Sequence, residues 1–113
     1  MVSIVDLAIR QLAAYNAADL DEFVACYHPD VRVLNGDDET IRGREALRER
    51  YRSLFENWTF GASVPQRLNV GPHCVDLEHW WRIDPESGTR SEGTLIVRYE
   101  ARDNTIATVQ FLS

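Results

Sequence analysis

Apolar residues recur at helical spacing through the N-terminal half of the chain. This pattern predicts helices over residues 4–17, 20–27 and 44–57. Ser3 is suited to cap the first helix, and Asp19 the second, because their side-chain oxygens can accept hydrogen bonds from the free N–H groups of a first turn. We therefore expect three amphipathic helices, each with one buried face.

A short strand is expected between the second and third helices. Pro29 should end the second helix, because proline lacks the N–H that a helix interior needs. The alternation of apolar and polar side chains that follows predicts a strand over residues 31–34, which runs into the turn Asn35-Gly36. Ile41 indicates a second, very short strand before the third helix.

From Phe60 onward the apolar period changes to two, which is typical of strands. Connections rich in Gly, Pro, Asp and Asn separate the strands and favour tight turns, so the segments form an antiparallel meander. The predicted strands cover residues 63–70, 73–83, 90–101 and 105–112. We predict an α+β fold, in which a strongly bent antiparallel sheet packs against three N-terminal helices as a cone with an interior.

Length and composition fit one globular domain over residues 1–113, with 44% apolar residues and a net charge of −6. That charge repels phosphate backbones and anionic membranes, so neither nucleic acid nor a membrane is an expected partner. No apolar run approaches the roughly 20 residues that span a bilayer, and no basic segment precedes the first helix. We expect a cytoplasmic protein.

Cys26 and Cys74 are predicted to be reduced, buried thiols. The alternative is a disulfide between them.

This order of elements resembles the nuclear-transport-factor-2-like superfamily, and within it the SnoaL-like and ketosteroid-isomerase-like domains. Four segments carry the resemblance: ADLD at 18–21, YHPDV at 27–31, IRGREAL at 41–47 and VDLE at 75–78. The resemblance implies a cone that holds a small, mostly apolar molecule. It covers enzymes as well as non-catalytic binding and dimerisation modules, so fold alone does not decide function.

The groups that ketosteroid isomerases use for chemistry are not found at the matching positions. The proton-shuttling Asp corresponds to Asn35, the oxyanion-hole Tyr to Gln11 and its partner Asp to Leu95. Steroid isomerisation by that mechanism is therefore not expected, unless a slip in the loop brings Asp37 or Asp38 to the mouth of the cone. Two supporting tyrosines of that family do match, at Tyr27 and Tyr51.

Limonene-epoxide hydrolases give a second comparison, because they hold the attacking water with an Asn at the end of the first strand. Asn35 matches that position. The charged set of that family does not match, since its nearest counterparts here are His79 and Trp81. The general base of that mechanism is missing.

The strand over 73–83 has one mainly apolar face, which includes Leu77, His79 and Trp81, and we expect this face to look into the cone. His79 would then be an imidazole among apolar side chains, suited to acid-base chemistry near neutral pH. The alternatives are a buried histidine hydrogen-bonded to Tyr51 or Gln11, or a histidine at the rim of the cone. Candidate catalytic residues are His79 and Asn35; candidate ligand-binding residues are Gln11, Tyr15, Tyr27, Tyr51, Phe55, Trp58, Trp81, Leu95 and Phe111.

The other face of that strand is expected to point outward and to include Trp80. An outward tryptophan beside Ile96 indicates an interface, and the resemblance implies dimerisation through the outer sheet face. We therefore expect a homodimer through that face.

A cluster of arginines in and just before the third helix could indicate an anion site, but interleaved glutamates favour a solvated helix face. The five arginines are Arg42, Arg44, Arg48, Arg50 and Arg52. No metal is expected, because His28, His73 and His79 have no metal-binding spacing, and no cofactor fingerprint is present. The sequence thus predicts a SnoaL-like protein that binds a small apolar molecule, and possible activities are cofactor-free isomerisation, dehydration or hydrolysis. The alternative is a non-catalytic dimerisation or ligand-sensing module.

Overall fold

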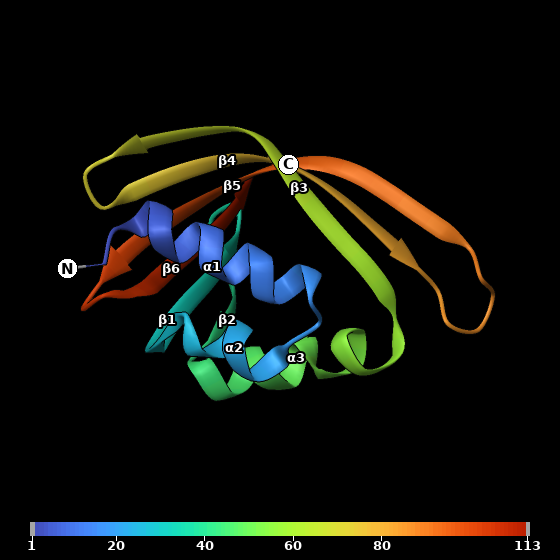
Figure 1. The fold of residues 1–113 in the computed structure, drawn as a ribbon. Coiled ribbons are helices and arrows are strands. Elements are labelled where there is room, and N and C mark those ends of the chain that lie inside the picture. Colours follow the sequence, from blue (N-terminus) through green and yellow to red (C-terminus); the bar gives the residue numbers. More distant parts are fainter. Residues whose placement is uncertain (1, 113) are drawn as a thin grey trace.

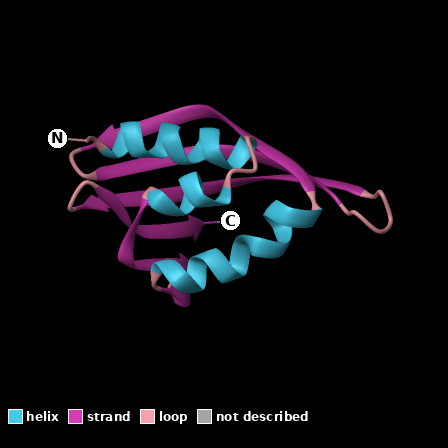
Figure 2. Cartoon of the chain, turned by 60° about the horizontal axis from the view of Figure 1, so that its bottom comes forward, coloured by secondary structure: helices cyan, strands magenta, loops and turns pink. Residues whose placement is uncertain are grey.

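Three helices lie against the concave face of a bent six-stranded sheet (Figures 1 and 2). The computed structural model describes residues 2–112. The helices are α1 (Ile4–Asn16), α2 (Leu20–Ala25) and α3 (Arg44–Asn57). The strands are β1 (Tyr27–Asn35), β2 (Asp38–Arg42), β3 (Thr59–Val70), β4 (His73–Ile83), β5 (Arg90–Arg102) and β6 (Thr105–Leu112). The predicted α+β cone is confirmed.

The sheet has the order β2-β1-β6-β5-β4-β3 and is mixed. The meander β3 to β6 is antiparallel as predicted, but β1 pairs with β6 in parallel. The expectation of an antiparallel sheet was wrong at this one junction. Because β1 precedes the meander and is joined to it through β2 and α3, it can lie beside the last strand in the same direction.

The helix starts follow the predicted caps. Ser3 accepts from the N–H of Asp6, whose carboxylate accepts in return from the N–H of Ser3. Asp19 accepts from the N–H of Glu22 at 3.1 Å. The side chain of Glu22 forms a salt bridge with Arg10 of α1, which ties α2 to the first helix.

Pro29 does not end a helix, contrary to prediction, because α2 stops at Ala25 and β1 already begins at Tyr27. The pairing of β1 with β6 is interrupted between Tyr27 and Arg32. Proline is tolerated in that stretch because no ladder hydrogen bond there requires its missing N–H. The strand is therefore longer than its apolar alternation suggested.

The two faces of β4 are reversed relative to the prediction. Glu78 lies opposite Leu95, and Trp80 opposite Gly93. Glu78, Trp80 and Leu95 all line the interior, whereas His79 is exposed on the outer face, where its Nδ1 lies 2.8 Å from the hydroxyl of Thr94. Because side chains alternate along a strand, a register difference of one residue exchanges the two faces completely.

The inner face of β4 accommodates a charge because that charge is paired. The side chain of Asp76 is fully buried, and Arg67 of β3 donates two hydrogen bonds to its carboxylate at 2.7 and 2.9 Å. Cys74 lies beside the pair and contacts the same carboxylate through Sγ at 3.4 Å. Cys26 and Cys74 are both free and buried, so the prediction of two thiols is confirmed.

No helix within residues 2–112 combines the length and apolar character needed to cross a membrane.

The core between the helices and the sheet contains a set of aromatic rings that hold the three helices together. Phe23 of α2 lies 5.2 Å from Phe55 of α3 between ring centroids, and Tyr15 of α1 lies 4.7 Å from Phe60 of β3. This cluster fixes one wall of the interior.

Candidate functional site

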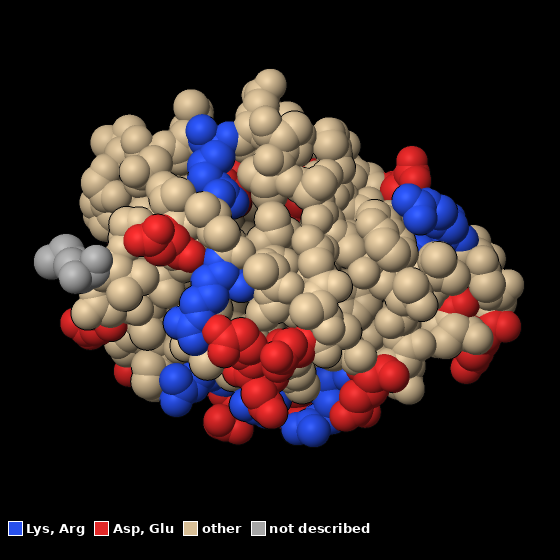
Figure 3. Space-filling model, in the orientation of Figure 1, with Lys and Arg blue, Asp and Glu red and all other residues tan. Residues whose placement is uncertain are grey.

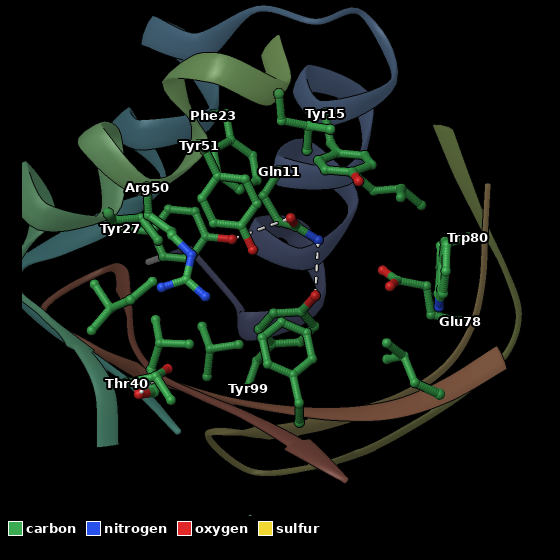
Figure 4. Close-up of a pocket in the computed structure, with 18 of the residues that line it drawn as sticks. Gln11, Tyr15, Phe23, Tyr27, Thr40, Arg50, Tyr51, Glu78, Trp80 and Tyr99 are labelled. Atoms are coloured by element: carbon green, nitrogen blue, oxygen red, sulfur yellow. Dashed lines mark hydrogen bonds between the residues drawn. The ribbon is translucent and has the colours of Figure 1, made fainter. Parts of the chain in front are cut away.

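A cavity of about 430 Å³ lies between the three helices and the inner face of the sheet (Figure 4). Its volume is in the range of small-molecule sites. Apolar side chains make up much of the wall: Leu12, Phe23, Val33, Ile41, Leu47, Leu54, Trp80, Leu95, Val109 and Phe111. Polar side chains among them are Gln11, Tyr15, Tyr27, Asn35, Thr40, Arg50, Tyr51, Glu78, Arg82 and Tyr99.

Most of the residues proposed from the sequence do line this cavity. They are Gln11, Tyr15, Tyr27, Asn35, Tyr51, Leu95 and Phe111. Asn35 is exposed at its rim, at the end of β1. Asp37 and Asp38 are absent from the lining, so a loop slip does not return a carboxylate to this position.

Four proposed residues lie elsewhere. His79 and Trp81 are on the outer face of β4, where the Cζ of Arg90 lies 4.8 Å from the indole centroid of Trp81. Phe55 is buried in the aromatic cluster behind the wall. Trp58 borders a separate shallow groove next to the turn between β4 and β5. A direct catalytic role for His79 in the cavity is thus contradicted by its position.

Gln11 connects two tyrosines at the base of the cavity. Its Oε1 accepts from the hydroxyl of Tyr27 at 3.2 Å, and its Nε2 donates to the hydroxyl of Tyr99 at 3.2 Å and to the carbonyl of Ala8. Burial raises the pKa of Tyr27 and of Tyr99 well above 10, so both hydroxyls stay protonated. Because Tyr99 accepts from Gln11, its own O–H is available to donate to a ligand.

Glu78 places a carboxyl group in the wall of the cavity that β4 forms (Figure 4). The pKa of Glu78 is raised from 4.5 to about 7, first by burial and then by the charge of Asp76, and Arg82 partly offsets both effects. Within residues 2–112 this carboxyl takes part in neither a salt bridge nor a hydrogen bond. A carboxyl group with a pKa near neutrality can both accept and release a proton.

Trp80 separates Glu78 from Arg82 along the inner face of β4. The indole of Trp80 lies over Gly93, and the Cζ of Arg82 is 5.5 Å from the indole centroid. The Nε of Arg82 is buried without a hydrogen-bond partner among the described residues. A buried donor of this kind is costly, and an oxygen atom of a ligand would satisfy it.

Arg50 and Tyr51 bring two further donors from α3. Figure 4 shows both side chains directed toward the cavity, on the side away from Glu78. Burial raises the pKa of Tyr51 to about 12, so this hydroxyl also remains a donor. The cavity therefore has an arginine and a tyrosine on one wall and a weakly acidic carboxyl group on the other.

Comparison with known proteins identifies the family. The SnoaL-like domain family matches residues 8–109, which is most of the chain. The chain belongs to the SnoaL-like domain family. No curated protein is similar enough in sequence to be matched.

Solved structures share the fold of this SnoaL-like domain. A cystatin-fold protein from Novosphingobium aromaticivorans is 24% identical with a TM-score of 0.89, and each chain is covered completely. A Delta 5-3-ketosteroid isomerase from Mycobacterium sp. is 14% identical with a TM-score of 0.88, covering 100% of this chain and 94% of that one. A Mycobacterium tuberculosis protein in complex with estradiol-17beta-hemisuccinate is 12% identical with a TM-score of 0.86, covering 96% and 92%. At these identities the likeness shows the fold alone.

Sequence reasoning missed the polar groups that β4 and α3 of this SnoaL-like domain direct into the cavity. Glu78 and Arg82 were missed because the sequence analysis expected the other face of β4 to point inward. Arg50 was missed because it was assigned to a solvated helix face. The pairing of Arg67 with Asp76 was the available signal, because two opposite charges at facing positions of adjacent strands can be buried together. Within residues 2–112, no group of three or more His, Cys, Asp or Glu side chains is arranged to hold a metal ion.

Proposed function

We propose that this SnoaL-like protein binds a small, mainly apolar carbonyl compound and moves a proton on it without a cofactor. The observation that carries the proposal is the carboxyl group of Glu78, which faces the cavity with a pKa of about 7 and without a partner among the described residues. Groups with such shifted pKa values in a cavity are typical of acid-base sites.

Glu78 would act as the base. It takes a proton from the carbon next to the carbonyl, the electron pair of that C–H bond shifts into an enolate, and the carboxylic acid formed returns the proton to another carbon. The hydroxyl of Tyr99, which already accepts from Gln11, donates to the oxygen on which charge develops. The outcome is an isomerisation that consumes no other reactant. His79 has no part in this scheme, and Asn35 is a ligand contact at the rim.

Exchange of hydrogen for deuterium at carbon tests this proposal. Cyclic ketones and enones are incubated in D₂O with wild type, E78Q and E92Q, and exchange is followed by NMR. Glu92 is exposed on β5 and pairs with Arg90, so E92Q is a matched control. We expect catalysed exchange in wild type and in E92Q, and a loss of roughly 10²–10⁴-fold in E78Q. Equal exchange in E78Q and wild type contradicts the role of Glu78.

Ligand binding without turnover is the second candidate. It is favoured by Asn35, whose amide cannot take up a proton at the position where ketosteroid isomerases have their base. Binding raises the melting temperature of a native protein, so the same compounds are also tested by thermal shift. A compound that raises the melting temperature without any exchange at carbon supports this second candidate.

We also propose a homodimer through the outer face of the sheet, with cytoplasmic location as a further expectation. Trp80 cannot belong to such an interface because it lines the cavity. The outer face instead exposes apolar side chains, among them Leu68 (72% exposed), Val70 (77%), Ile96 (42%) and Leu112 (42%). An exposed apolar surface of this kind favours association.

A further inference from the structure

The arginines of α3 differ in what their guanidinium groups contact. Arg44 donates to the carbonyl of Tyr27, Arg48 pairs with Asp21 and Arg52 pairs with Glu49. Figure 3 shows charged side chains of both signs gathered along the lower rim, where Figure 1 places α2 and α3. These three arginines therefore belong to the mixed-charge surface that the sequence predicts.

Arg50 is an exception to this arrangement. It lines the cavity, and in the described part of the chain it takes part in neither a salt bridge nor a hydrogen bond. Figure 4 shows its guanidinium group directed inward, beside the rings of Tyr27 and Tyr51. Arg50 is an exposed residue that also lines the cavity, so its side chain lies at the mouth of the cavity.

The charge of the cavity is opposite to that of the whole protein. The chain has a net charge of −6, yet the cavity wall has two arginines, Arg50 and Arg82, against the single carboxyl group of Glu78. Because the pKa of Glu78 is about 7, that carboxyl group is only partly ionised near neutral pH. An anionic ligand thus meets a cavity whose lining has a net positive charge.

We infer that the ligand has a carboxylate group on an apolar body, and that Arg50 and Tyr51 bind this carboxylate at the mouth of the cavity. A guanidinium group matches the planar geometry of a carboxylate and can donate two hydrogen bonds to it. The hydroxyl of Tyr51 stays protonated and offers a third donor. Glu78, on the opposite wall, is then left to the carbonyl end of the molecule (Figure 4).

This inference rests on the proposed function for the orientation of the ligand, but its test does not require turnover. Naphthoate and naphthamide have the same apolar body and differ in charge, so their dissociation constants isolate the carboxylate. Isothermal titration calorimetry is performed with wild type, R50Q, R50K and R52Q. R52Q is the matched control, because Arg52 lies on the same helix in a salt bridge with Glu49 and is absent from the cavity lining.

We expect wild type and R52Q to bind naphthoate more tightly than naphthamide. R50Q should weaken naphthoate binding by roughly 10- to 100-fold, the effect of losing charge-assisted hydrogen bonds, and should leave naphthamide binding unchanged. R50K retains the charge without the planar fork and should fall between wild type and R50Q. Unchanged melting temperatures of the variants verify that they fold.

Three results would overturn the inference. One is equal affinity of wild type for the two probes, and another is no binding of either. The third is a carboxylate preference that persists in R50Q but disappears in R82Q, which would assign the anion to Arg82. Repeating the titration in E78Q separates the two proposals: there the carboxylate preference should persist although proton transfer is lost.

Discussion

At the scale of single residues, the main feature of the molecule is a glutamate in an apolar wall. Glu78 has the ordinary pKa of 4.5 in an unfolded chain and about 7 in the folded protein. Between these values the unfolded chain releases its proton while the folded protein keeps it. The contribution of Glu78 to stability is therefore present in full below pH 4.5 and is lost as the pH rises to about 7.

The first prediction concerns the stability of E78Q. Above the folded pKa, wild type must keep a buried negative charge that the glutamine lacks, and a shift from 4.5 to about 7 corresponds to about 3 kcal/mol at most. We expect E78Q to unfold at a higher urea concentration than wild type at about pH 8, and the difference to vanish toward about pH 4.

The matched control for this prediction is E92Q, which removes an exposed carboxylate paired with Arg90. E92Q should follow wild type within a few tenths of a kcal/mol across the same pH range, because exposed ion pairs contribute little. Parallel curves for E78Q and wild type would show that Glu78 is not desolvated in the folded protein.

At the scale of the elements, β4 places two neighbouring tryptophans on opposite faces of the sheet, each over a glycine of an adjacent strand. A Cβ atom added at Gly93 would lie 2.8 Å from Trp80 in the cavity, and one at Gly61 would lie 2.9 Å from Trp81 on the outer face. The glycines thus provide room for the indole rings.

The second prediction uses this symmetry. G93A and G61A should each lose about 1–3 kcal/mol of stability, because the indole must move from its position over the glycine. Only G93A should weaken naphthamide binding, since Trp80 lines the cavity and Trp81 does not. Denaturant unfolding and calorimetric titration measure the two effects. Loss of binding in G61A, or unchanged binding in G93A, would contradict the position of Trp80.

At the scale of the whole molecule, the helices cover one face of the sheet and leave the other open (Figure 2). Ile96 lies near the middle of that open face, opposite Leu77 on one side and Leu112 on the other. Apolar side chains in cross-strand neighbours form a continuous surface that a second copy of the chain could cover.

The third prediction is the oligomeric state. We expect wild type to sediment as a dimer at tens of micromolar, and I96E as a monomer, because a charge in an apolar interface must be desolvated. Ile9, 53% exposed on α1, gives the control variant I9E, which should remain dimeric. A monomeric wild type, or dissociation of both variants, would exclude an interface at the outer face.

The sequence by itself determined the elements and the family. Caps at Ser3 and Asp19, helical apolar spacing and the change to period two from Phe60 are local signals, because each depends on the geometry of a few neighbouring residues. The predicted bounds 44–57, 73–83 and 105–112 match α3, β4 and β6. Gln11 and Tyr51 were placed correctly because the faces of α1 and α3 follow from one helix period.

The tertiary structure decided which face of β4 is inside, and with it the chemistry of the cavity. Both faces of β4 combine apolar and polar residues, so alternation alone cannot orient the strand. The choice depends on the pairing of β4 with β5 and on the salt bridge of Asp76 with Arg67, and both join residues distant in sequence. For this reason Glu78 and Arg82 replace His79 in the cavity, and the parallel pairing of β1 with β6 appears only in the folded sheet.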